Sequence, residues 1–90
     1  MHTLSLRIKG YVQGVGFRYF VQQTAEANGV RGEVWNGRDR AVHVIAQHED
    51  EAVLKRFEEE MWNGPGRVDE VQAEPCAAKT YYGFGVSATR

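Results

Sequence analysis

An arginine follows directly after a glycine-rich stretch near the start of this 90-residue chain. Glycine stands at positions 10, 14 and 16, and Phe17 and Arg18 come next. Because glycine takes positive φ at little cost, such a backbone can turn several N–H groups into one small volume. The Arg18 guanidinium offers a planar fork of donors that suits a phosphate or a carboxylate. These residue types and their spacing predict an anion-binding loop with its own cation.

Two better-known glycine motifs do not match this stretch. A P-loop ends in Gly-Lys followed by Ser or Thr, and no such sequence follows Gly14. The dinucleotide-binding fingerprint Gly-x-Gly-x-x-Gly begins with Gly14 and Gly16, but its third glycine is replaced by Tyr19. Glycine content leaves open a tight turn whose glycines only relieve crowding. Arg18 argues against that alternative, because a cation at a helix start opposes the helix dipole unless an anion binds there.

Asn36 is the second candidate for chemistry. It ends the run GEVWN at residues 32–36, directly before Gly37. A neutral amide can accept a hydrogen bond from water and donate one to a phosphoryl oxygen, so it can align an attack without transferring a proton. An asparagine before glycine is also typical of a turn. The residue types alone leave both interpretations open.

The hydrophobic pattern predicts the elements that must position these residues. Apolar residues alternate along the predicted strands and recur at helical spacing along the predicted helices, with Asp50 as the expected N-cap of the second helix. The predicted order is strand 3–12, helix 17–28, strand 30–36, strand 41–47, helix 50–63 and a strand around 68–73. A short fifth strand is expected within residues 81–86.

This order, βαββαβ, is typical of an α+β, ferredoxin-like fold. We expect an antiparallel sheet with strand order 4-1-3-2 and both helices on one face. The glycine-rich stretch would then follow the first strand, and Asn36 would end the second strand. The fold alone does not name a function, because many functions share this plan.

Three stretches resemble one protein family. Residues 12–18, VQGVGFR, resemble the signature of the acylphosphatase family, and GEVWN at 32–36 resembles its second landmark. Gly64-Pro65, followed by Val68 and Val71, resembles a third family stretch. The resemblance extends over residues 4–84, and it implies a single acylphosphatase-like domain over residues 1–90.

The resemblance implies metal-free hydrolysis of acyl phosphates to a carboxylate and inorganic phosphate. Arg18 and Asn36 would be the catalytic residues, and Asn36 would place the attacking water. Besides the Arg18 guanidinium, the phosphate would be held by the backbone N–H groups of Gly14, Val15, Gly16, Phe17 and Arg18. Neither a cofactor nor a metal is implied. The expected partners are a small-molecule acyl phosphate and inorganic phosphate, the latter as product and inhibitor.

The chain departs from the family pattern in three places, one of which is the C-terminal aromatic-Gly-aromatic-Gly segment at residues 82–85. Glu33 stands where the family often has tryptophan, and Trp35 lies two residues further on. Because side chains alternate along a strand, Glu33 and Trp35 should share one face and Asn36 should lie on the other. Ala41 stands where the family commonly has serine or threonine, so a hydroxyl that would support Asn36 is missing. We expect these departures to affect the level of activity more than the reaction type.

Composition limits the other classes of function. The chain has 11 Lys and Arg and 12 Asp and Glu, and its net charge of −1 gives no electrostatic footprint for nucleic acid or an anionic membrane. No apolar run approaches the length of a membrane span or a signal-peptide core. We therefore expect a cytoplasmic monomer.

The remaining reactive side chains predict neither a metal site nor a thiol enzyme. His2, His43 and His48 have no ligand spacing with one another or with Cys76. Cys76 lacks the arginine that follows the nucleophile of cysteine phosphatases, and it has no partner for an internal disulfide. A competing hypothesis is a non-enzymatic module that binds an anion or a partner, since acylphosphatase-like domains also begin larger hydrogenase-maturation proteins. No further domain follows Arg90 in this sequence, which favours the enzyme.

Overall fold

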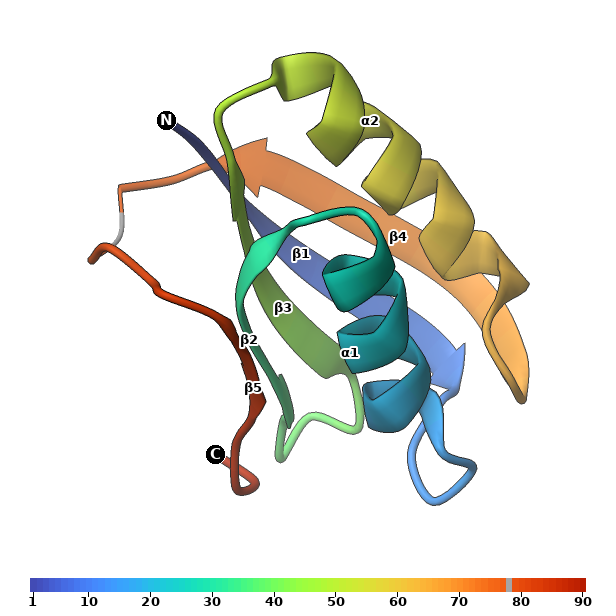
Figure 1. Cartoon of the computed structure of the whole chain (residues 1–90). Coiled ribbons are helices and arrows are strands. Elements are labelled where there is room, and N and C mark those ends of the chain that lie inside the picture. The colour runs from blue at the N-terminus through green and yellow to red at the C-terminus, as the bar shows by residue number, and fades with distance from the viewer. Residues whose placement is uncertain (78) are drawn as a thin grey trace.

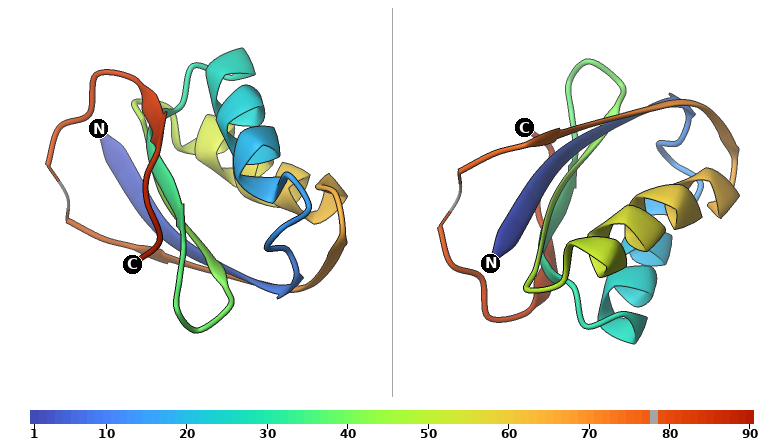
Figure 2. Two further views of the ribbon diagram at one scale, coloured as in Figure 1. Left: turned by 90° about the horizontal axis from the view of Figure 1, so that it is seen from below. Right: turned by 90° about the horizontal axis from the view of Figure 1, so that it is seen from above.

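Two helices cover one face of a five-stranded sheet in the computed structural model, which describes residues 1–77 and 79–90 (Figure 1). Both views in Figure 2 show the helices on the same side of the sheet. In chain order the elements are β1 (His2–Tyr11), α1 (Phe17–Ala27), β2 (Arg31–Asn36), β3 (Val42–His48), α2 (Glu51–Glu60), the 3-10 helix η1 (Met61–Asn63), β4 (Arg67–Pro75) and β5 (Phe84–Val86). The predicted α+β, ferredoxin-like fold is confirmed.

The strands lie in the order β4-β1-β3-β2-β5. β1 pairs antiparallel with β3 and β4, and β2 pairs antiparallel with β3, so the predicted order 4-1-3-2 is confirmed. The expected short fifth strand is also present. It pairs in parallel with β2, with Gly32 opposite Phe84 and Val34 opposite Val86. β5 therefore makes an otherwise antiparallel sheet mixed, and it forms the edge opposite β4 (Figure 1).

Alternating strand residues and one stripe on each helix form the core. In β3, Val42, Val44 and Ala46 are buried, whereas His43 and Ile45 are only half-buried on the other face. The buried residues of each helix recur three or four positions apart, as expected for one helical stripe. The buried hydrophobic residues of the core are Leu6, Ile8, Val12, Phe17, Val21, Ala25, Val30, Val34, Val42, Val44, Ala46, Leu54, Phe57, Met61 and Phe84.

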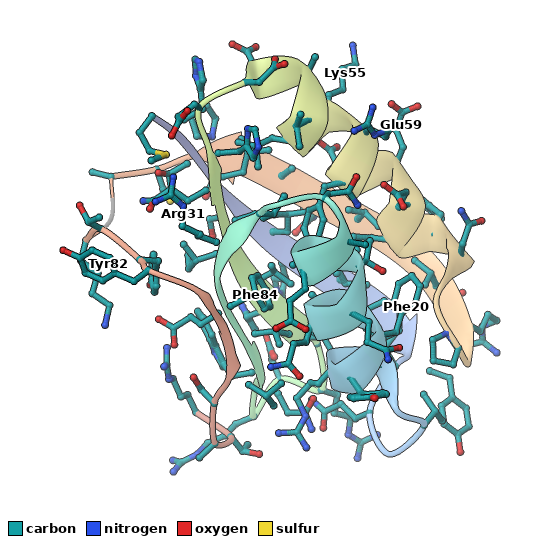
Figure 3. All side chains as sticks on the ribbon, viewed as in Figure 1. Phe20, Arg31, Lys55, Glu59, Tyr82 and Phe84 are labelled. Atoms are coloured by element: carbon teal, nitrogen blue, oxygen red, sulfur yellow. The ribbon has the colours of Figure 1, made fainter. Side chains whose placement is uncertain are left out.

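Core packing determines where α1 and β5 lie. Phe17, the first residue of α1, is buried, and its ring centroid lies 5.5 Å from that of Phe20. Figure 3 shows Phe84 beside α1, whereas Tyr82 points away from the body and is 92% exposed.

Within the described ranges, none of the helices is long and apolar enough to span a membrane.

Candidate active site

The glycine loop, residues 12–16, connects the end of β1 to the first residue of α1. Gly14 has φ 75° and Gly16 has φ 83°. This left-handed region costs a residue with a side chain about 1–2 kcal/mol, so glycine suits both positions. Gly16 is also the N-cap of α1, and no side chain there accepts a hydrogen bond from the first turn. The loop therefore turns sharply and leaves the start of α1 uncapped.

The backbone N–H groups of residues 14–18 have no acceptor within the described part of the chain. An α-helix leaves its first N–H groups unpaired, and a capping side chain or a ligand usually satisfies them. The first turn of α1 carries no acidic residue, so the positive end of the helix dipole is not offset by a carboxylate there. A bound anion would satisfy both the donors and the dipole.

Arg18 is the second residue of α1, and its side chain is half-buried. The Arg18 Nη1 atom donates to the backbone oxygen of Ser87 at 3.2 Å. A guanidinium carries five N–H donors, so this contact orients the group and leaves donors for a ligand. The predicted phosphate-binding cation therefore lies at the uncapped helix start with its orientation set by a backbone carbonyl.

Asn36 is the last residue of β2 and lies on the same face of the sheet as the buried Val34. Its backbone pairs with Val42, and its carbonyl accepts a hydrogen bond from Arg90 N at 3.0 Å. The Asn36 Oδ1 atom is buried and has no hydrogen-bond partner among the described residues. A buried acceptor without a donor costs about 1–3 kcal/mol, so it indicates that a water or ligand is the partner.

One cavity brings the two candidate residues together. Its volume is about 250 Å³, and its lining consists of Val12, Gly14, Gly16, Phe17, Arg18, Tyr19, Asn36 and Val86. All but one of the predicted site residues therefore surround one space. The exception is Val15, whose side chain packs against the core instead.

Gln13 links the glycine loop to the turn that follows Asn36. The Gln13 Nε2 atom donates to the backbone oxygens of Gly37 at 2.9 Å and Ala41 at 3.0 Å. Because Asn36 directly precedes this turn, the two hydrogen bonds hold the glycine loop in a fixed position relative to Asn36. Sequence reasoning assigned Gln13 no role, although a long polar side chain within the glycine loop was an available signal.

Residues 81–90, here called the 81–90 segment, border the site from the other side. Ser87 N donates to Val34 O at 2.8 Å, and Arg90 N donates to Asn36 O, so pairing with β2 continues past the end of β5. Sequence reasoning missed this contribution. The contacts that reach Arg18 and Asn36 come from backbone atoms of a distant segment, and such contacts leave no local pattern of residue types.

A larger hollow lies on the open face of the sheet, the face away from the helices. It has a volume of about 590 Å³ and is lined by Ser5, Arg7, His43, Gln72, Ala73 and Glu74. Both of its basic side chains are already engaged, because Arg7 Nε lies 3.0 Å from Asp39 Oδ2 and His43 Nε2 lies 3.1 Å from Asp39 Oδ1. Hydrogen bonds from His43, the Ala41 backbone N–H and Arg7 lower the pKa of Asp39 to about 2, and the bond from His43 has the largest effect. This hollow therefore offers an anion fewer free donors than the glycine loop does.

The remaining reactive groups lie apart from the cavity. Cys76 follows β4, and burial, then the nearby Glu74 carboxylate, raises the pKa of its thiol. A raised pKa makes a thiol a poorer nucleophile at neutral pH. Within residues 1–77 and 79–90, no three His, Cys, Asp or Glu side chains gather as they would around a metal ion.

Comparison with known proteins decides the family. The acylphosphatase family model matches residues 4–86, which include the glycine loop, Arg18 and Asn36. The chain belongs to the acylphosphatase family. An acylphosphatase of Thermotoga maritima is 40% identical over 88 residues, which is 96% of this chain and 97% of the relative. One of Oceanobacillus iheyensis is 44% identical over 83 residues, which is 89% of this chain and 90% of the relative.

Solved structures agree with this assignment. The crystal structure of acylphosphatase from Bacillus subtilis matches with a TM-score of 0.91 and 31% identity, over 97% of this chain and 99% of that chain. Full-length HypF in its phosphate- and nucleotide-bound form matches with a TM-score of 0.87 and 27% identity, over 98% of this chain but only 12% of that chain. Membership of the acylphosphatase family identifies this chain as a hydrolase of acyl phosphates.

Proposed function

We propose that residues 14–18 and Asn36 catalyse the hydrolysis of acyl phosphates without a metal. Residues 1–90 would form one domain for this reaction, and the protein would act as a monomer in the cytoplasm. The N–H groups of residues 14–18 and the Arg18 guanidinium would hold the phosphoryl oxygens. The Asn36 Oδ1 atom would accept a hydrogen bond from the attacking water, and its amide nitrogen would donate to the phosphoryl group. Inorganic phosphate, the product, would compete with the substrate for the same donors.

The observation that carries this proposal is a match between unpaired groups. The start of α1 presents N–H donors with no acceptor among the described residues, and Asn36 Oδ1 is a buried acceptor with no donor there. Gly14, Gly16, Arg18 and Asn36 line the same cavity. A phosphoryl group with an in-line water would pair with all of these groups at once.

The reaction would need positioning and charge stabilisation more than proton transfer. The water oxygen attacks phosphorus, the bond from phosphorus to the acyl oxygen breaks, and its electron pair leaves on the carboxylate. A carboxylate is stable as an anion, so no general acid has to protonate it. Charge on the phosphoryl oxygens in the loose transition state would be stabilised by Arg18 and by the backbone donors. The proton lost by the water ends on phosphate or in solvent.

A hydrolysis assay on a simple acyl phosphate tests the proposal. Arginine stays charged and asparagine does not ionise near neutrality, so the rate should be nearly flat over roughly pH 5.5–8, and a chelator should not change it. Asn36→Ala should lower kcat by about 10²-fold, the size expected for one positioned catalytic group. Asn63→Ala, which changes an exposed asparagine of η1, is the matched control and should leave kcat unchanged.

Two results would contradict the proposal in different ways. A steep limb near pH 6.5, lost in a variant of one histidine, would mean that a histidine acts as general base. Binding of inorganic phosphate without turnover would favour a non-enzymatic module, which the match to a small part of full-length HypF makes a specific alternative.

A further inference from the structure

Glu33 joins β2 to the 81–90 segment on the open face of the sheet. Its side chain is 15% exposed and receives hydrogen bonds from Tyr81 Oη at 2.6 Å, from Ser87 Oγ at 2.9 Å and from the Arg90 guanidinium. Burial raises the pKa of Glu33, but these three hydrogen bonds together lower it below its ordinary value. Burial, then the hydrogen bond to Glu33, raises the pKa of Tyr81 to about 12. Glu33 is therefore held as a carboxylate.

Ser87 connects this carboxylate to the active-site arginine. Its Oγ atom donates to Glu33 Oε1 at 2.9 Å, while its backbone oxygen accepts from Arg18 Nη1 at 3.2 Å. Its backbone nitrogen is fixed as well, because it donates to Val34 O at 2.8 Å. A single residue thus links a carboxylate on the open face of the sheet to a guanidinium on the helix face.

Arg90 makes a second connection from Glu33 toward the site. Its guanidinium pairs with Glu33 and lies 4.1 Å above the Trp35 ring. Its backbone nitrogen donates to Asn36 O at 3.0 Å, and its backbone oxygen accepts from Arg38 N at 3.0 Å. Glu33 therefore holds the two residues of the 81–90 segment whose backbones contact Arg18 and Asn36.

We propose that Glu33 is a positioning residue for Arg18, acting through Ser87, and that it thereby sets the affinity of the site for a phosphoryl group. The inference rests on the proposed function for the role of Arg18. Glu33 is absent from the lining of the cavity, so it would act without touching the substrate. Without its carboxylate, the 81–90 segment loses three side-chain hydrogen bonds. The carbonyl that orients Arg18 is then held by backbone pairing with β2, through β5 and the bond from Ser87 N to Val34 O.

The test measures binding of inorganic phosphate by calorimetry, together with KM and kcat for an acyl phosphate. Glu33→Ala should raise the phosphate Kd and KM by about tenfold, as for the loss of one hydrogen bond to a charged group, and should lower kcat less. Glu49→Ala is the matched control. It breaks an exposed ion pair with Arg31 at 3.3 Å that does not involve the 81–90 segment, and it should change neither constant.

A role limited to stability gives a different result. It would lower the melting temperature and the active fraction of Glu33→Ala while the phosphate Kd of the folded protein stayed at the wild-type value, and that outcome overturns the proposal. In an Arg18→Ala background, Glu33→Ala should weaken phosphate binding no further, because its effect is transmitted through Arg18. A full additional tenfold loss in that background would also overturn it.

Two milder variants apply if Glu33→Ala does not fold. Glu33→Gln keeps an oxygen for Ser87 but loses the charge, and Ser87→Ala removes the hydroxyl but keeps the carbonyl. Each should raise the phosphate Kd by about two- to fivefold, since each removes only part of the connection. A wild-type Kd in both variants overturns the proposal. Phosphate binding needs no turnover, so a wild-type protein that binds phosphate but hydrolyses nothing would refute the proposed function and leave this inference standing.

Discussion

The two helices of this protein begin in opposite ways. At α2, Asp50 Oδ1 accepts a hydrogen bond from Ala52 N at 2.9 Å, and Glu51 places a negative charge in the first turn. At α1, the N-cap is Gly16, which has no side chain to accept a bond, and the first turn carries Arg18. The arrangement at α2 stabilises a helix, whereas a cation at a helix start opposes the dipole.

This difference supports the proposed phosphate site at the start of α1. The start of α1 is held in place by burial of Phe17 and by its contact with Phe20, so the helix forms without a cap. Its N–H donors stay available for an anion as a result. The start of α1 keeps unpaired N–H groups, whereas Asp50 caps the start of α2, and this contrast is what the proposed phosphate site at α1 predicts.

The largest effect should come from removing the cation at α1. Arg18→Ala should lower kcat/KM by about 10²- to 10³-fold, because it removes a donor to the phosphoryl group in both the bound and the transition states. Arg56→Ala is the matched change in α2, where Arg56 Nη2 reaches Asn28 Oδ1 at 3.4 Å, and it should leave the rate unchanged. Inorganic phosphate should raise the melting temperature of the Arg18 variant less than that of the Arg56 variant, because only the Arg18 variant has lost a phosphate contact. Equal losses of kcat/KM in the Arg18 and Arg56 variants would contradict the proposal that only the start of α1 binds the phosphoryl group.

An intermediate effect should follow from changing the two N-caps. A methyl group at Gly16 would meet no neighbouring atom, so the cost of Gly16→Ala comes from its φ of 83° and should be about 1–2 kcal/mol. Asp50→Ala should cost about 1 kcal/mol through loss of the cap. Activity should separate the two, because only Gly16→Ala misplaces the N–H donors and should lower kcat/KM by about tenfold or more. Urea unfolding measures the loss of stability, and steady-state kinetics measure kcat/KM. A low kcat/KM for Asp50→Ala would contradict the predicted difference between the two N-caps.

The smallest effect should come from giving α1 the acidic first turn of α2. Tyr19 is 62% exposed at the cavity, and Tyr19→Glu should stabilise the helix by about 0.3–1 kcal/mol while weakening phosphate binding a few-fold. Glutamine has nearly the same shape as glutamate without the charge. The difference in phosphate affinity between Tyr19→Glu and Tyr19→Gln therefore measures the electrostatic contribution. Glu51→Gln in α2 should lose a few tenths of a kcal/mol and no activity. Tighter phosphate binding by Tyr19→Glu would rule out an anion site at this helix start.

Most of the fold could be predicted because local pattern and tertiary packing agree. Asp50 was expected to cap the second helix, and its hydrogen bond with Ala52 confirms it. The helix predicted over 50–63 forms as α2 and then η1, because its last turn tightens before Gly64. Gly64 precedes Pro65, and a residue before proline is pushed out of helical geometry, in agreement with its ψ of 166°.

The site could be predicted only in part. Arg18 and Asn36 were found from residue type and family resemblance, and the structure places both on one cavity, while their catalytic roles stay predictions. The contacts of Gln13 and Ser87 could not be found in the same way. Both use backbone carbonyls as acceptors, and every residue type supplies one, so the partner depends on how distant segments pack. The parallel pairing of β5 with β2 could not be predicted from the sequence either, because the residue pattern of a three-residue strand is too short to specify its neighbour.

The place of β5 at the sheet edge affects how the molecule fluctuates. β5 spans three residues and pairs with β2 along one side only. Short edge segments of this kind open locally at a lower free energy than a core strand. Opening of β5 would withdraw Ser87 from Arg18 while β1, β3 and both helices stay folded, which gives the protein a folded but unproductive substate. The Ser87 amide should therefore exchange with deuterium sooner than that of Val44, and on heating, turnover should fail before the helical circular dichroism signal is lost.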